Sequence, residues 1–243
     1  MPLSERLQSV ARMITPGLKV ADIGCDHGYL AIYLIKNQIS PHVIAMDIGC
    51  GPLERAMQHV QEAGLAPDIE IRLSDGMAEL KEGEAECVVM AGMGGPLMID
   101  IMKRGEDICD ELNELILQPQ SEIDKVRHFL EDSGYRIISE DIVLEDGKFY
   151  PMMKVIHGEM NLEREIYYRF GKILLREEHP VLRAYLRNER RQLLEVRREL
   201  MDSPMTERVE ARLKEIASDI AMVDEAILMS DKINPVTIER VIQ

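Results

Sequence analysis

Short apolar segments alternate with helical segments over the first 158 residues, and this alternation limits the possible folds more than any other feature. Strands are predicted over residues 20–24, 42–47, 69–75, 86–92 and 114–120. Helices are predicted over residues 29–37, 52–63, 96–104 and 122–133. Near-continuous apolar strands separated by helices predict an α/β fold, with a parallel sheet covered on both faces.

Two further strands are predicted at the end of this region. Residues 135–157 contain two β-like runs around a turn at 145–148, which holds Asp146 and Gly147. Strands joined by so short a turn are antiparallel. We therefore expect the parallel sheet to end in an antiparallel edge pair.

The pattern changes after Gly158, where rows of mostly apolar residues step by four and three positions, as in a coiled coil. The rows are Leu182, Leu186, Glu189, Leu193, Val196, Leu200 and then Val209, Leu213, Ile216, Ile220, Val223, Ile227. Ser203 is expected to cap the second helix, with Pro204 in its first turn. We expect domains over 1–158 and 159–243, the second an α-helical coiled-coil hairpin. Its seam can close within one chain, which favours a monomer.

Composition excludes several classes of protein. Of the 243 residues, 46% are hydrophobic, but no apolar run approaches the roughly 18–20 residues of a membrane span. The four cysteines form no CxxC pair and no metal-ligand spacing. We expect free thiols in a reducing cytoplasm, with neither a membrane partner nor a bound metal.

Charge is distributed unevenly along the chain. The net charge of −15 by itself argues against a nucleic-acid partner. Residues 164–198, however, hold ten basic and five acidic residues. A local concentration of positive charge of this kind can attract a polyanion even when the whole protein is acidic. A solvated helix face is the alternative explanation.

A glycine-rich turn follows the first predicted strand. Residues 22–30 read DIGCDHGYL, in which Gly24 and Gly28 allow a sharp turn and close approach to a ligand. A dinucleotide fingerprint would have a further glycine where this chain has Asp26. A carboxylate suits pyrophosphate poorly, which disfavours a nicotinamide oxidoreductase. It suits S-adenosylmethionine (SAM), which carries an ammonium, a sulfonium and a ribose diol.

Polar or small residues also end the next three strands. Asp47 lies 25 residues after Asp22, where a carboxylate can accept both ribose hydroxyls. Asp75 follows the third strand, where it can bind an adenine amino group, and residues 91–95 (AGMGG) follow the fourth. A single aspartate at the end of a strand usually only stabilises the following loop. Their joint occurrence at the ligand edge of a parallel sheet predicts SAM binding.

Together these motifs resemble the bacterial TrmK family, tRNA adenine N1-methyltransferases that act at position 22 of the tRNA. The resemblance rests on GCDHGYL (24–30), GPL (51–53), SDG (74–76), AGMGG (91–95) and LQP (117–119). Gln120 departs from the family pattern, which more often has asparagine there. The resemblance implies a Rossmann-like class I SAM-dependent methyltransferase domain followed by the coiled-coil hairpin.

The resemblance also assigns roles to residues. It implies that the glycine-rich turn holds SAM, that Asp47 holds its ribose, and that the segment from Ala91 borders the methyl group and the target base. The full expected SAM site is Asp22, Gly24, Cys25, Asp26, His27, Gly28, Asp47, Ile48, Asp75, Gly76, Ala91, Gly92 and Met93. Cys25 is expected to pack beside the ligand, and His27 has the alternative role of a hydrogen bonder at the helix start.

The AGMGG segment bears on the mechanism. Its side chains offer no hydrogen-bonding group to orient an exocyclic amine, which argues against the adenine N6 amine as nucleophile. Adenine N1 already holds an in-plane lone pair, so the enzyme must align it and stabilise a cationic product. The catalytic candidates are Asp26 and the backbone around Gly92 and Met93, with Arg6 and His27 as further candidates.

A tRNA partner follows from the resemblance. Reaching N1 within folded RNA requires unpairing or extruding the base. Guanidinium groups suit phosphate contacts, and the candidates on the predicted helix are Arg183, Arg187, Arg190, Arg191, Arg197 and Arg198. Two alternatives remain open: a methyltransferase that acts on a small molecule or a protein, and a non-catalytic interaction protein.

Overall fold

The computed structural model describes residues 3–230, and the chain divides between Glu163 and Arg164 into two compact units. The expected domain boundary at residue 158 lies in the coil of residues 158–164. The expected second domain also includes residues 231–243, which lie outside the described residues. No helix within residues 3–230 is long and apolar enough to cross a membrane.

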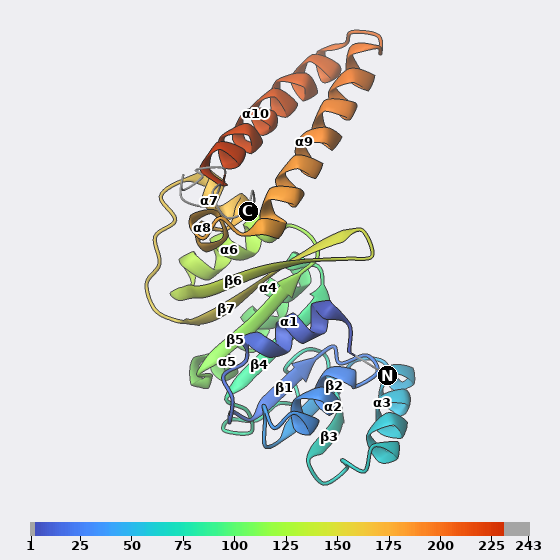
Figure 1. Cartoon of the computed structure of the whole chain (residues 1–243). Coiled ribbons are helices and arrows are strands. Elements are labelled where there is room, and N and C mark those ends of the chain that lie inside the picture. The colour runs from blue at the N-terminus through green and yellow to red at the C-terminus, as the bar shows by residue number, and fades with distance from the viewer. Residues whose placement is uncertain (1–2, 231–243) are drawn as a thin grey trace, which may run out of the picture. The chain divides into compact units, whose positions relative to one another are not determined.

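Seven strands within residues 3–230 form one mixed sheet in the order β3-β2-β1-β4-β5-β7-β6 (Figure 1). The parallel strands are β1 (Val20–Ile23), β2 (Val43–Asp47), β3 (Ile69–Leu73), β4 (Cys87–Met93) and β5 (Glu114–Pro119). The hairpin of β6 (Tyr135–Glu145) and β7 (Lys148–His157) is antiparallel, and β7 pairs with β5. The predicted α/β fold with an antiparallel edge pair is confirmed.

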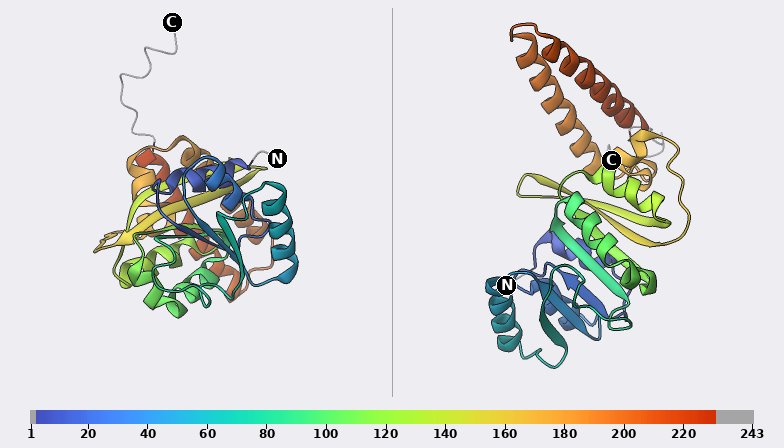
Figure 2. Two further views of the ribbon diagram at one scale, coloured as in Figure 1. Left: turned by 90° about the horizontal axis from the view of Figure 1, so that it is seen from below. Right: turned by 180° about the vertical axis from the view of Figure 1, so that it is seen from behind.

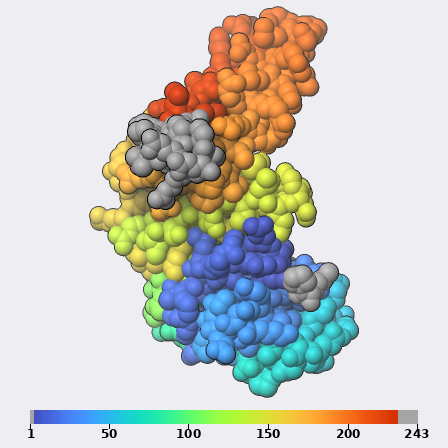
Figure 3. Space-filling model, viewed as in Figure 1, coloured from blue at the N-terminus to red at the C-terminus, as the bar shows by residue number. Residues whose placement is uncertain are grey.

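Helices cover both faces of the sheet (Figure 2). They are α1 (Glu5–Met13), α2 (Tyr29–Lys36), α3 (Cys50–Glu62), α4 (Gly95–Arg104), α5 (Glu106–Glu111) and α6 (Ile123–Asp132). Successive strand residues point to opposite faces, so Val88 packs with α4 and α6 whereas Val89 packs with α1, α2 and α3. Figure 3 shows α1 to α3 side by side on one face of the first unit.

Helix α1 is fixed at both ends. The Ser4 hydroxyl caps it by accepting from the Leu7 N–H, and the Glu145 carboxylate accepts from the Glu5 N–H (2.6 Å). After the helix, Thr15 donates its N–H and hydroxyl to the buried Glu114 carboxylate (2.7 and 2.6 Å). These contacts hold the first turn of α1 beside the end of β6, and the segment after α1 beside the start of β5.

The second unit contains α7 (Glu165–Phe170), α8 (Lys172–Arg176), α9 (Pro180–Met201) and α10 (Glu207–Ser230). Helices α9 and α10 lie antiparallel, as predicted (Figure 1). Leu182, Leu186, Ile216, Ile220 and Val223 are buried, but farther along α9 the row is more open, and Val196 is 40% exposed.

The expected cap of the second long helix is wrong. The Ser203 hydroxyl donates to the Glu199 carbonyl, and its N–H donates to the Leu200 carbonyl, so Ser203 ends α9. Pro204 therefore lies in the loop. Thr206 takes the capping role, because its hydroxyl accepts from the Val209 N–H (3.2 Å).

Candidate active site

The carboxyl ends of β1 and β4 border a pocket of about 310 Å³. It brings together seven of the residues expected to bind SAM: Asp22, Gly24, Cys25, Asp26, His27, Ala91 and Gly92. Arg6 from α1 and Gln120 after β5 also line it. The pocket therefore lies at the edge of the sheet where the sequence motifs converge.

The turn between β1 and α2 has an unusual backbone. Gly24 (φ 77°), Asp26 (φ 51°) and Gly28 (φ 72°) all adopt the left-handed conformation. A Cβ at Gly28 would lie 3.1 Å from the Cβ of Ala56 on α3. The Gly24 N–H donates to the Met46 carbonyl (2.8 Å), which ties the turn to β2. Glycine is needed here both for the conformation and for the space.

Asp22 is the buried acid of the pocket. Its side chain is 4% exposed, and its Oδ2 has no hydrogen-bond partner within residues 3–230. Burial, with a contribution from Asp47, raises the pKa of Asp22 to about 7, while Arg6 opposes the shift. A buried carboxylate oxygen without a partner favours a cationic ligand, and the ammonium of SAM meets that requirement.

Asp47 is fixed beside this turn by two backbone groups. The Asp26 N–H donates to Oδ2 (3.2 Å), and the Gly49 N–H donates to Oδ1 (2.9 Å). Each carboxylate oxygen retains further lone-pair capacity, which fits two ribose hydroxyls. Ile48 follows and is 70% exposed, so its apolar side chain is available to a ligand.

His27 is anchored to α3 as well as lining the pocket. Its Nδ1 accepts from Nε of Arg55 (3.0 Å), and its carbonyl lies 3.0 Å from Nδ1 of His59. The Tyr29 ring stacks on His59, with ring centroids 4.8 Å apart. These contacts tie His27 to α3. The His27 Nε2 also lies 3.5 Å from Oδ2 of the exposed Asp26 carboxylate.

Other expected residues lie outside the pocket lining. Gly28 and Asp47 adjoin it through the contacts above, whereas Ile48, Asp75, Gly76 and Met93 do not line it. Asp75 is held by the guanidinium of Arg104 at the end of α4, through bonds of 3.0 and 3.2 Å. A Cβ at Gly76 (φ 61°) would lie 2.9 Å from side-chain carbons of Ile101. Gly76 is thus required for packing.

The AGMGG segment lines the pocket at Ala91 and Gly92. Gly92 has φ 90°, and a Cβ there would lie 3.5 Å from Nη1 of Arg6 and 3.7 Å from Nε2 of Gln120. The Met93 carbonyl accepts from the Gln120 N–H (2.9 Å), so it already serves the loop after β5. Ala91 and Gly92 are thus the residues of this segment that line the pocket, and Met93 is not among them.

Two polar residues of the lining, Gln120 and Arg6, are outside the SAM site expected from the sequence. The sequence marks Gln120 only as a departure from the family pattern and Arg6 only as a further catalytic candidate. Nη1 of Arg6 donates to Oε1 of the fully buried Gln118 (2.9 Å), and the guanidinium lies over the Tyr150 ring. Polar residues at the carboxyl end of the fifth parallel strand were the signal available for the glutamines.

The environment of Cys25 determines the reactivity of its thiol. Burial and the neighbouring Asp22 raise the pKa of the Cys25 thiol far above its ordinary value, so it stays protonated and unsuited to nucleophilic attack.

Within residues 3–230, no three histidine, cysteine, aspartate or glutamate side chains form a group that could hold a metal ion.

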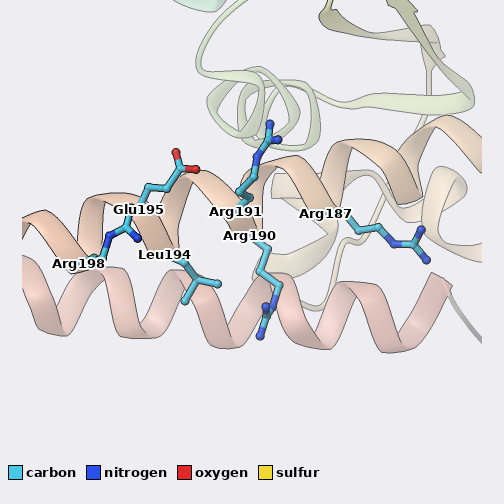
Figure 4. A pocket seen from close by; sticks show the side chains of 6 residues that line it. All are labelled: Arg187, Arg190, Arg191, Leu194, Glu195 and Arg198. Carbon is cyan, nitrogen blue, oxygen red and sulfur yellow. The ribbon is translucent and has the colours of Figure 1, made fainter.

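Helix α9 carries the expected RNA-binding arginines. A hollow of about 430 Å³ is lined by six residues of the helix, and Figure 4 shows Arg190 and Leu194 pointing toward α10. Three of the arginines contact polar side chains: Arg183 bonds to Glu178, Arg190 to Asp224, and Arg191 to Asn188.

The other three arginines of α9 have no such contacts among the described residues. Arg187, Arg197 and Arg198 make no side-chain hydrogen bond or ion pair within residues 3–230. Their charges are therefore available to an outside partner.

Comparison with known proteins identifies the family. A model described as a methyltransferase domain matches residues 3–153. The tRNA (adenine(22)-N(1))-methyltransferase of Bacillus subtilis is 32% identical over 232 residues, or 93% of this chain and 98% of that protein. The chain belongs to the TrmK family. The resemblance inferred from the sequence motifs is thus confirmed.

Solved structures of TrmK relatives agree. Streptococcus pneumoniae Sp1610, in complex with S-adenosyl-L-methionine, has a TM-score of 0.84 and 31% identity. The similarity covers 93% of this chain and 100% of that one. Mycoplasma capricolum TrmK, in complex with S-adenosyl-homocysteine, has a TM-score of 0.81 and 26% identity, with coverage of 93% and 98%.

Proposed function

We propose that this protein transfers the methyl group of SAM to N1 of an adenosine in tRNA, at position 22. The observation that carries the proposal is the match to the Bacillus subtilis tRNA (adenine(22)-N(1))-methyltransferase over 93% of the chain. That match includes the helical unit as well as the methyltransferase unit. The unpartnered Asp22 carboxylate in the pocket supports SAM as the methyl donor.

We assign a part of SAM to each polar residue of the strand edge. Asp22 receives the ammonium, Asp47 the ribose hydroxyls, and Asp75 the adenine amino group, with Ile48 against the adenine ring. Arg6 is the cation that lines the pocket nearest to Gly92, and it suits the carboxylate of the donor. The residues Gly24, Cys25, Asp26, His27 and Gly28 then surround the methionine portion.

SAM supplies an electrophilic methyl group on a sulfonium. Adenine N1 forms the new bond with its own lone pair while the sulfur–carbon bond breaks, and the positive charge moves to the base. No residue has to remove a proton. The protein therefore has to align the base and to stabilise the positive charge of the methylated base with nearby oxygen atoms. Ala91 and Gly92 leave room for the base plane, and their carbonyls with the Asp26 carboxylate provide those oxygens.

We propose that the arginine surface of α9 binds tRNA phosphates. Arg187, Arg197 and Arg198 carry most of this role, because Arg183 and Arg190 are already paired with acidic side chains. The acidic remainder of the protein repels RNA from other surfaces. We also propose a cytoplasmic monomer, since the buried faces of α9 and α10 satisfy each other within one chain.

The proposal is tested by incubating the protein with labelled SAM and an unmodified tRNA transcript, followed by reverse transcription of the product. N1-methyladenosine blocks Watson–Crick pairing, so we expect arrest at the adenosine at position 22. The arrest should be lost in Asp26→Ala and retained in the control Asp107→Ala, which changes an exposed residue of α5. Label without arrest would overturn the N1 assignment. SAM binding without label would overturn tRNA as the acceptor.

A further inference from the structure

The side chain of Gln120 lines the candidate pocket beside Gly92. Gln120 is the first residue after β5, and its backbone N–H donates to the Met93 carbonyl (2.9 Å). This bond fixes the start of the loop against β4. The exposed side chain lines the same pocket as Asp22 and Gly92, with Nε2 near the open side of Gly92.

The other polar groups of the pocket already have partners or assigned roles. Asp22 and Arg6 are charged and match the charged ends of the donor, and the Gln118 amide is buried and bonded to Arg6. Gln120 is the carboxamide among the lining residues, and its side chain makes no hydrogen bond within residues 3–230. A neutral group with one donor and one acceptor face is therefore available to a ligand.

We propose that Gln120 selects adenine as the target base by binding its N6 and N7 edge; this inference rests on the proposed function. The amide oxygen accepts from the N6 amine, and the amide nitrogen donates to N7, the pairing by which glutamine distinguishes adenine from other bases. Guanine presents two acceptors on that edge, so the amide satisfies only one of them. The pairing leaves N1 free to react.

The same contact becomes stronger as the reaction proceeds. Attack through N1 leaves a positive charge that spreads over the ring and onto the N6 amine, whose hydrogen becomes a better donor. The Gln120 oxygen therefore stabilises the transition state more than the bound substrate, which raises kcat as well as binding.

Gly92 provides the space for this contact. A Cβ at this position would come within 3.7 Å of Nε2 of Gln120 and 3.5 Å of Nη1 of Arg6. The absence of a side chain leaves the area below the amide open to the edge of a purine. The left-handed φ of 90° at Gly92 also makes any other residue costly there.

The experiment compares two tRNA transcripts, one with adenosine and one with 7-deazaadenosine at position 22. The analogue keeps N1 and N6 but replaces the N7 acceptor with a C–H group. For the wild-type protein we expect kcat/KM to fall about tenfold on the analogue, as expected for losing one hydrogen bond of a bidentate pair. For Gln120→Ala we expect a fall of about tenfold to a hundredfold on adenosine, and the same rate on both substrates.

A second variant makes the assignment sharper. The carboxylate of Gln120→Glu accepts from N6 but repels the N7 lone pair, so this variant should prefer the 7-deaza substrate, which reverses the wild-type preference. SAM affinity measured by calorimetry should stay within about twofold in both variants, because the amide faces the base. Gln61→Ala, on the exposed surface of α3, is the control and should behave as wild type.

The outcomes separate this inference from the proposed function. If wild-type protein methylates tRNA but Gln120→Ala still discriminates against 7-deazaadenosine, Gln120 does not read the base. If the variants lose SAM affinity in proportion to activity, the residue serves the donor instead. If wild-type protein binds SAM but methylates neither transcript, the proposed function itself is wrong.

Discussion

Arg104 holds Asp75 in a two-point contact, with Nη1 donating to Oδ2 (3.0 Å) and Nη2 donating to Oδ1 (3.2 Å). Nε of the same guanidinium donates to Asp100 (2.9 Å), which fixes its plane. Each oxygen of Asp75 keeps further lone-pair capacity. The contact therefore orients the carboxylate for a second partner without excluding that partner, and we expect Arg104 to act as a positioning residue for the adenine of SAM.

Substituting Arg104 tests this relationship. In Arg104→Met the Asp75 carboxylate loses its orientation, and we expect the Kd for SAM to rise roughly threefold to tenfold, as for loss of one charge-assisted contact. Calorimetry on the tRNA-free protein measures this directly. Lys125→Met removes a cation from another exposed ion pair, on α6, and is the matched control. Equal SAM affinity in the two variants would contradict the positioning role.

Asp22 gives a pH dependence whose sign can be worked out. Its pKa rises from 3.8 in the unfolded chain to about 7 in the folded protein. Between these values the native state binds more protons, so the free energy of unfolding falls as the pH rises from about 4 to 7. Asp22→Asn removes this dependence. Its stability relative to wild type should therefore increase by about 2–3 kcal/mol between pH 5 and pH 8.

Denaturant unfolding of the SAM-free protein at both pH values measures the effect. Parallel stability profiles for Asp22→Asn and wild type would show that burial does not raise this pKa. Adding SAM provides a second check, because a cation beside Asp22 favours the ionised carboxylate. SAM should then stabilise wild-type protein more at pH 8 than at pH 5, and Asp22→Asn should lose that difference.

The arginine surface of α9 can be tested by charge reversal. Changing Arg187, Arg197 and Arg198 together to glutamate should weaken tRNA binding roughly tenfold or more and lower the salt dependence of log K by about two to three units. SAM affinity should not change. The matched control reverses Lys19, Lys81 and Lys148, exposed cations of the first unit. If both triple variants bind tRNA equally well, α9 is not the specific RNA surface.

Gly92→Ala tests the lining of the pocket at this position. The new methyl group would occupy the space below Arg6 and Gln120, and alanine at φ 90° is strained. We expect the free energy of unfolding to fall by about 1–2 kcal/mol. We also expect kcat for tRNA methylation to fall much more than it does in the control variant described next. Gly134→Ala also has a positive φ, but its Cβ would meet nothing within 4 Å, so it controls for strain alone. Equal falls in kcat would contradict the role of space at Gly92.

The predicted elements were accurate where local patterns decide the structure. Strands with continuous apolar residues and helices with periodic ones lie where the sequence placed them, within a few residues. The turn of Gly24 and Gly28 was recognisable because its conformation demands glycine. Ser203 shows the limit of local reasoning: it could cap either of two helices, and its bond to Glu199 assigned it to the end of α9.

The sequence by itself determined the order of the elements, the position of the SAM motif and the presence of carboxylates at successive strand ends, since each depends on residues close together in the chain. The tertiary structure decided which distant residues share the pocket. Arg6 meets Gln118, 112 positions away, because α1 packs against the edge hairpin, and Arg104 reaches Asp75 because α4 ends beside the loop after β3. Such polar contacts leave no periodic trace in the sequence, because they depend on how elements pack together.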